Sequence, residues 1–263
     1  MPLYSEQQGS KDHPTLVFLH GFLGNRKDWK TTIEHLKNDF HCVTIDLPGH
    51  GSSVANVAPL EGGFEHCHQL IKFTLSSLNI TSFCLIGYSL GGRIALDYAR
   101  SQKDSRLKHL ILESCHIGLM DQASKQSRYQ FDLTWAEKFS TQSIEESLQQ
   151  WYSQAIFNDL SEQQKHTIIK KRSHNYGVFL ANMLLSTSLS QQHCARDYLS
   201  KTTLAISYFY GQKDTKFTQI AKLIPQTKNI KTHCFNGLGH NTHQQDPINY
   251  AYNIKKLLLT EHF

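Results

Sequence analysis

The chain has 263 residues, of which 39% are hydrophobic and 19% charged, and its formal net charge is +5 at pH 7. This composition is typical of a globular protein that buries a core, and it argues against disorder. The basic residues are spread along the chain without a long run, so a nucleic-acid or polybasic membrane surface has little support. The positive excess is most simply an ordinary surface, although it would also attract an anionic small molecule.

The N-terminal segment MPLYSEQQGSKDH is polar and has no apolar stretch like that of a secretory signal. No window contains the about 18 apolar residues of a membrane-spanning helix. We therefore expect a cytoplasmic protein without a membrane span. The six cysteines lie far apart without a C-x-x-C pair, which favours buried free thiols. The sixteen histidines show no metal-ligand spacing, so we expect no metal site.

In residues 1–115 short apolar runs alternate with segments of helical length and spacing. This β-α-β-α-β alternation predicts an α/β fold with a parallel sheet covered on both faces. The predicted strands are Thr15–His20, His41–Asp46, Ser82–Gly87 and Leu107–Glu113, and the predicted helices are Phe64–Leu78 and Leu90–Arg100.

The alternation stops between residues 116 and 190, where the chain is polar and rich in Gln and Ser with helical periods. This segment is too long for a simple loop, so we expect an inserted helical cap. Residues 1–115 and 191–263 then form the two parts of one core. The later predicted strands are Thr203–Tyr210 and Asn229–Phe235, and the later predicted helices are Lys216–Leu223 and Asp246–Leu259.

A G-x-S-x-G motif follows the third predicted strand and opens the next helix, at Gly87-Tyr88-Ser89-Leu90-Gly91. The motif alone matches many incidental turns, but a strand–turn–helix context is typical of a catalytic serine. The glycines permit a sharp turn that holds the serine above the sheet edge. The Leu90 amide at the helix N-terminus would stabilise negative charge beside the Ser89 hydroxyl.

A catalytic serine needs a histidine, and the histidine needs an acid to orient it. Asp214 and His240 each follow a predicted strand, and they stand in the chain order Ser, acid, His of α/β-hydrolases. Asp214 is by itself equally well explained as a helix N-cap. His240 is one of sixteen histidines, with His243 three positions away. The combination of order and strand-end placement favours a catalytic triad.

The turn after the first predicted strand, His20-Gly21-Phe22, supplies a second candidate oxyanion donor, the Phe22 amide. A plain tight turn at Gly21 is the alternative. The cluster Asp46-Leu47-Pro48-Gly49-His50-Gly51 is more typical of a structural turn.

The segments VFLHGFLG, DLPGHGSS, GYSLGGR, GQKDTKF and GHNTH resemble the 2-succinyl-6-hydroxy-2,4-cyclohexadiene-1-carboxylate (SHCHC) synthase family of the menaquinone pathway, within the α/β-hydrolase superfamily. The matches run from about Leu16 to His243. DLPGHG, the HG turn and G-x-S-x-G are shared by many superfamily members. GYSLGGR, GQKDTKF and the WY and RSHNYG segments of the cap are narrower. The resemblance implies an α/β-hydrolase fold with a mostly parallel sheet and a helical cap.

The resemblance also implies a lyase that eliminates pyruvate from a succinylated enolpyruvyl-cyclohexene-carboxylate, with the triad as general base and without a cofactor. By similarity, Arg93, Arg128 and Arg172 match carboxylate-binding arginines, whose planar forks suit carboxylates. Tyr88 and Trp151 match pocket aromatics. Taken singly, each arginine is more simply a solvated surface residue, and each aromatic is equally well core filler.

Two other functions remain open from the residues alone. A hydrolase of an ester, thioester or C–C bond would use the same triad with Ser89 as covalent nucleophile. A binding module with an inactive triad is the third possibility, although an intact Ser/Asp/His set argues against it. The sequence does not define the oligomeric state.

Overall fold

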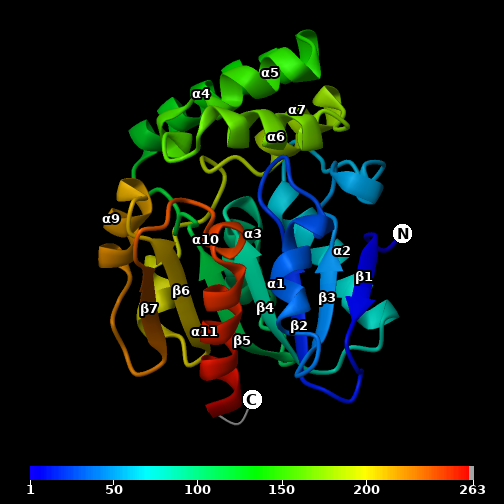
Figure 1. Ribbon diagram of the computed structural model, residues 1–263. Helices are drawn as coiled ribbons and strands as arrows, with labels where there is room; N and C mark the ends of the chain where they lie inside the picture. The colour runs from blue at the N-terminus through cyan, green and yellow to red at the C-terminus, as the bar shows by residue number, and fades with distance from the viewer. Residues whose placement is uncertain (261–263) are drawn as a thin grey trace.

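The computed structural model describes residues 1–260 and contains a seven-stranded sheet in the order β1-β3-β2-β4-β5-β6-β7 (Figure 1). β1 runs antiparallel to β3, and all the other neighbouring strands are parallel. The predicted mostly parallel α/β sheet is therefore confirmed. The strands are β1 (Ser5–Gln8), β2 (Thr15–Leu19), β3 (His41–Ile45), β4 (Phe83–Tyr88), β5 (Leu107–Glu113), β6 (Ala205–Gly211) and β7 (Ile230–Phe235).

The edge strand β1 was not predicted, because its sequence SEQQ has neither apolar alternation nor β-branched residues. The strand is stabilised instead by its backbone pairing with β3, which runs from Ser5 opposite Ile45 to Gln8 opposite Cys42. A short polar strand is a common way to end a sheet without exposing an apolar edge.

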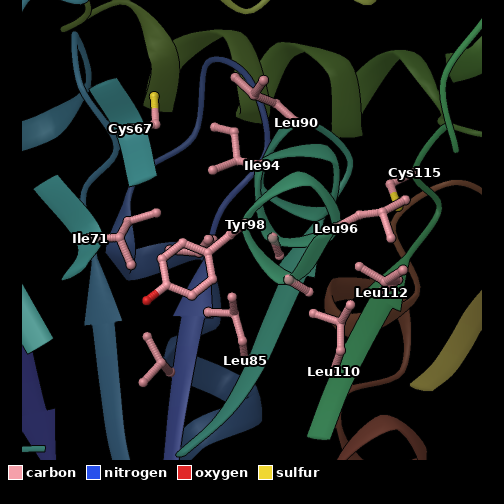
Figure 2. Packing of buried hydrophobic residues seen from close by; sticks show 14 of the residues in the cluster. Cys67, Ile71, Leu85, Leu90, Ile94, Leu96, Tyr98, Leu110, Leu112 and Cys115 are labelled. Carbon is pink, nitrogen blue, oxygen red and sulfur yellow. The ribbon is translucent and has the colours of Figure 1, made fainter. Parts of the chain in front are cut away.

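Strands β2 to β7 contribute alternate side chains to two apolar layers, as expected for a sheet covered on both faces. Val17 and Leu19 of β2 pack into one layer, and Leu16 and Phe18 pack into the other. Figure 2 shows part of the first layer, where side chains of the helices α2 and α3 lie against β4 and β5. The first layer is covered by α2 (Gly63–Ser77), α3 (Leu90–Gln102), α8 (Arg196–Lys201) and α9 (Thr215–Leu223), and the second by α1 (Lys30–Glu34) and α11 (Pro247–Thr260).

Four further helices lie above the carboxyl ends of the strands (Figure 1). They have a small apolar core of their own, to which Trp135, Phe139, Tyr152 and Leu180 contribute, and Leu23 of the sheet domain joins it. We propose that residues 116–190 form one cap inserted between the two parts of the core, 1–115 and 191–263. These helices are α4 (Gln122–Thr141), α5 (Ile144–Tyr152), α6 (Glu162–Arg172) and α7 (Gly177–Ser186). Within residues 1–260 no helix has the length and apolar character to cross a membrane.

All six cysteines are free, and Cys42, Cys67, Cys84 and Cys115 are buried as expected. Burial raises the pKa of the Cys42, Cys67 and Cys115 thiols to about 12. The expectation of buried thiols is wrong for Cys234, which is exposed because it lies on the edge strand β7.

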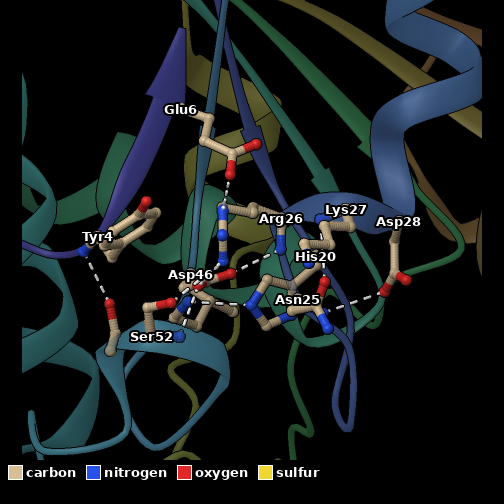
Figure 3. A network of polar contacts seen from close by, with 11 residues as sticks. Tyr4, Glu6, His20, Asn25, Arg26, Lys27, Asp28, Asp46 and Ser52 are labelled. Carbon is tan, nitrogen blue, oxygen red and sulfur yellow. Dashed lines mark hydrogen bonds and ion pairs between the residues drawn. The ribbon is translucent and has the colours of Figure 1, made fainter. Parts of the chain in front are cut away.

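A buried carboxylate organises the turn after β3 (Figure 3). The Asp46 side chain accepts hydrogen bonds from the amide and the Nη1 of Arg26, both at 2.7 Å, and from the amide of Ser52 at 2.8 Å. Arg26 Nε also donates to Glu6 Oε1 of β1 at 2.6 Å. Gly51 has a φ of +51°, and a Cβ there would lie 2.4 Å from Asp46 Oδ2. The turn is therefore structural, and it fastens the edge strand to the sheet.

We predict that Asp46→Ala lowers the free energy of unfolding by about 3–5 kcal/mol, because the amides of Arg26 and Ser52 lose their acceptor and the Arg26 guanidinium keeps only Glu6 as an ion-pair partner. Urea denaturation measures this loss. Glu34→Gln is the matched control, since Glu34 pairs with Lys37 on the surface and should have no measurable effect. Equal midpoints for Asp46→Ala and the wild type would contradict the structural role of Asp46.

Candidate active site

Ser89 lies in the sharp turn between β4 and α3, with a φ of +52° and a ψ of −108°. Such a backbone costs about 1–3 kcal/mol for a non-glycine residue and is common at functional sites. The two motif glycines make the turn possible. A Cβ at Gly87 would lie 2.5 Å from the Gly91 carbonyl oxygen, and a Cβ at Gly91 would lie 2.4 Å from that of Leu19. The G-x-S-x-G spacing thus lets α3 approach β2 closely and holds the serine at the sheet edge.

Asp214 and His240 come together as a buried pair, with 2.6 Å between Asp214 Oδ2 and His240 Nδ1. A carboxylate acceptor fixes the proton on Nδ1, which leaves Nε2 free to accept a proton. The other oxygen of Asp214 accepts from the Phe217 amide at 3.3 Å and caps α9. Asp214 therefore acts as a helix cap and as a partner of His240 at once.

Ser89 and His240 both border two cavities, which we call the first cavity, of about 470 Å³, and the second cavity, of about 310 Å³. Within the described part of the chain no hydrogen bond joins the Ser89 hydroxyl to His240. Catalytic hydrogen bonds are often long in unliganded enzymes and tighten when substrate binds. A molecule that occupied both cavities would pass directly over these two side chains.

The second cavity is cationic, because Arg93, Arg128 and Lys216 all border it. Arg93 Nη1 donates to the Thr187 carbonyl oxygen at 2.7 Å, and Arg128 Nε pairs with Asp132 at 2.9 Å. Burial, reinforced by Arg128, lowers the pKa of Arg93 to about 10. Arg93 therefore stays charged at neutral pH, although its environment penalises the charge. An anionic group bound here would relieve that penalty.

The first cavity contains one arginine, Arg172 of the cap, which pairs with Asp28 of the sheet domain at 2.6 Å between Nη2 and Oδ2. Burial alone would lower the pKa of Arg172, but Asp28 and the Tyr152 hydroxyl raise it above its usual range. The Arg172 Nε is buried without a hydrogen-bond partner among residues 1–260. Arg172 is thus permanently charged. Its ion pair with Asp28 joins the helix α6 to the sheet domain, and its Nε–H remains able to donate a hydrogen bond.

Aromatic side chains form the apolar walls of both cavities. Trp151 and Phe22 border both cavities, with 5.1 Å between their ring centroids. Tyr88 borders the first cavity, and its ring centroid lies 5.3 Å from that of His240. Phe157, which was not predicted, also borders both cavities. These walls give the space around Ser89 an apolar lining.

We propose that two backbone amides act as oxyanion donors. Leu90 is the first residue of α3, so its amide has no acceptor within the helix. Phe22 borders both cavities beside Ser89. Two buried histidines hold the Phe22 turn: His20 Nε2 accepts from the Leu47 amide at 3.0 Å, and His50 Nε2 accepts from the Leu23 amide at 3.1 Å.

Apart from Asp214, which lies behind His240, every predicted site residue borders one or both cavities. The sequence interpretation missed Lys216, although it lies within the GQKDTKF motif, where its charge beside Asp214 was a usable signal. It also missed Asp28, for which no sequence signal exists. In the described portion of the chain, no group of three or more His, Cys, Asp or Glu side chains is arranged to hold a metal ion.

Comparisons with known proteins agree with this geometry. A family model described as alpha/beta hydrolase fold matches residues 14–247. A 2-succinyl-6-hydroxy-2,4-cyclohexadiene-1-carboxylate synthase of Enterobacter sp. (strain 638) is 38% identical over 250 residues, 95% of this chain and 93% of the relative. One of Klebsiella pneumoniae is 38% identical over 239 residues, 91% of each chain. The solved structure of MenH from S. aureus superimposes with a TM-score of 0.88 and 27% identity, over 99% of both chains.

We predict that Asp28→Asn lowers the free energy of unfolding by about 3 kcal/mol, because the buried Arg172 guanidinium loses its counterion. The same change opens Arg172 to an added anion. Succinate should therefore raise the thermal unfolding midpoint of Asp28→Asn more than that of the wild type. Differential scanning calorimetry with and without succinate measures both effects.

Asp39→Asn is the control for this experiment, since Asp39 pairs with Lys255 on the surface, with side chains 39% and 34% exposed. It should leave both the midpoint and the succinate response unchanged. An identical succinate response in Asp28→Asn and the wild type would show that Asp28 does not occupy the anion-binding edge of Arg172.

Proposed function

The chain belongs to the α/β-hydrolase family and, within it, to the SHCHC synthases of menaquinone biosynthesis, and from this premise we propose that Ser89, His240 and Asp214 act as its general-base triad. The observation that carries the proposal is the junction of two cavities at Ser89 and His240, with His240 held by Asp214. A base at that junction would lie against the middle of a substrate that extends into both cavities.

The enzyme is a lyase that eliminates pyruvate from a succinylated enolpyruvyl-cyclohexene-carboxylate. The ring hydrogen next to the succinyl carbonyl is acidic, because its removal gives an enolate. The electron pair of the broken C–H bond then forms a new ring double bond. The existing ring double bond shifts toward the carbon that carries the enolpyruvyl group. The C–O bond to the enolpyruvyl group breaks, and that group leaves and takes up a proton as pyruvate. The reaction consumes no water, oxidant or reductant.

In the proposed mechanism His240 accepts the proton, either directly at Nε2 or through the Ser89 hydroxyl. The short contact between Asp214 and Nδ1 stabilises the imidazolium that forms. A well-placed base typically contributes about 10²–10⁴-fold to the rate. The amides of Phe22 and Leu90 would stabilise the enolate oxygen, a contribution that is often larger.

The cations of both cavities suit a substrate with several carboxylates. Arg93, Arg128 and Lys216 border the second cavity. Arg172, which pairs with Asp28 and whose Nε has no hydrogen-bond partner among the described residues, borders the first. Because these charges lie on both sides of Ser89, they would hold an extended polyanion with its reacting carbon over the base. Tyr88 and Trp151 would pack against the ring. Burial keeps the pKa of Tyr88 well above its usual value, so its phenol stays neutral.

We predict that the purified enzyme releases pyruvate from the pathway substrate and that Ser89→Ala and His240→Ala abolish the release. Asp214→Asn should lower kcat by about 10⁴-fold, because the histidine would adopt the wrong tautomer. A coupled lactate dehydrogenase assay follows the pyruvate. Circular dichroism of each variant controls for folding. If Ser89→Ala and His240→Ala retained normal rates, the triad mechanism would be wrong. Water-dependent cleavage without pyruvate would indicate a hydrolase with Ser89 as nucleophile.

We also predict that Arg93→Ala raises KM by about 10- to 100-fold, since a hydrogen bond between charged groups contributes about 1.5–3 kcal/mol. Arg93→Lys should recover only part of the loss, because an ammonium lacks the planar fork. Arg100→Ala is the control on the same helix, where Arg100 pairs with Asp97 away from the cavities. A KM for Arg93→Ala equal to that of Arg100→Ala would remove Arg93 from the substrate site.

A further inference from the structure

A second carboxylate–histidine pair lies beside the triad. Glu113 is the last residue of β5, and its side chain is completely buried. Its Oε2 lies 2.7 Å from His243 Nδ1. Its Oε1 accepts from the Thr242 hydroxyl at 2.7 Å and from the His243 amide at 3.1 Å. One carboxylate thus receives three hydrogen bonds from two consecutive residues, and those residues lie just after His240.

The same residue also contacts the serine turn. The main-chain oxygen of Glu113 accepts from the Ser89 amide at 2.9 Å, beside the register pair of Tyr88 and Glu113 between β4 and β5. Its backbone therefore fixes the turn that carries Ser89, while its side chain fixes α10 (Thr242–Gln245), the helix that follows His240. Glu113 bridges the two segments that must meet for proton transfer.

The His243 ring is packed among aromatic side chains. It stacks on Trp29, with 3.9 Å between ring centroids, and meets Tyr88 edge-on at 4.9 Å. The His243 carbonyl oxygen also accepts from the Thr32 hydroxyl at 3.0 Å. The His243 side chain is only 1% exposed and borders neither cavity. It does not reach the substrate, so its contribution to the reaction is made through position.

We propose that Glu113 is a positioning residue for the lyase reaction. Through its bonds to Thr242 and His243, it holds the His240 loop at the correct distance from Ser89. The inference rests on the proposed triad. The Tyr88 ring contacts both His243 and His240, so it also restricts the position of the catalytic histidine. The other ionisable groups that face Glu113 are the Tyr88 and Tyr250 phenols and the Cys115 thiol, and none of them replaces its three hydrogen bonds.

The test compares Glu113→Ala with Glu113→Gln. Alanine removes both acceptor oxygens and with them all three hydrogen bonds, so we expect kcat for pyruvate release to fall by about 100-fold while KM changes less than about 3-fold, as for a displaced base. In glutamine, Oε1 keeps the bonds from Thr242 and the His243 amide, and the amide group donates to His243 Nδ1 in its other tautomer. Glu113→Gln should therefore recover most of kcat.

Asp97→Ala is the matched control, because Asp97 is also a buried, ion-paired carboxylate but lies away from the cavities. It should lower the unfolding temperature without changing kcat at the assay temperature. A folded Glu113→Ala enzyme with wild-type kcat would overturn the proposal, and so would a Glu113→Gln variant as impaired as Glu113→Ala. If Glu113→Ala does not fold, Thr242→Val removes one of the three bonds, and we expect a fall in kcat of about 10-fold; an unchanged kcat would again overturn it.

Ser89→Ala in the same assay separates this inference from the proposed function. An inactive Ser89→Ala with a normal Glu113→Ala would mean that the triad acts but that Glu113 only stabilises the fold. An active Ser89→Ala would mean that the triad mechanism itself has failed.

Discussion

The parallel alignment of β2, β4, β5 and β6 is the constraint on which the site depends. Because parallel strands end at one edge of a sheet, residues that follow four different strands meet there without any help from the loops between them. The Phe22 turn, Ser89, Glu113 and Asp214 all lie at that edge, and the loop after β7 adds His240. The glycines of the serine turn allow α3 and β2 to come close together, so that Phe22, Ser89 and His240 border the same cavities.

Charge determines what this edge can bind. A triad is compatible with many reactions. Buried cations on both sides of it, however, are unfavourable unless an anion neutralises their charge. The structure neutralises them only in part, with Asp28 beside Arg172 and Asp132 beside Arg128. Arg93 and Lys216 have burial and cationic neighbours that lower their pKa values. The site therefore gains most from a substrate that brings several carboxylates, as the menaquinone-pathway substrate does.

Most of the sheet could be predicted because β2 to β6 are short, largely apolar runs separated by helical segments, whereas β1 depends on a partner for its structure. The Asp214–His240 pair could be predicted because residue type, order and strand-end placement are local features. The pair of Asp28 and Arg172 could not, since 144 residues separate its members and each looks like a surface residue. His240 could be assigned as the partner of Asp214 from its strand-end position and the GHNTH resemblance. The acid partner of His243 could not be predicted, since Glu113 lies 130 residues away and looks like the end of an ordinary strand.

The cap then connects substrate binding with the triad. At one side Arg172 of the cap is fixed to Asp28 of the sheet domain. At the other, Gln245 donates to Asp159 of the cap and accepts from the Gly239 amide, both at 2.7 Å. Gly239 directly precedes His240, so the proposed cap and His240 are joined through one side chain. Because the fold alone is compatible with many reactions, contacts of this kind are where we expect lyase specificity to arise, since they would determine how a molecule lies against His240.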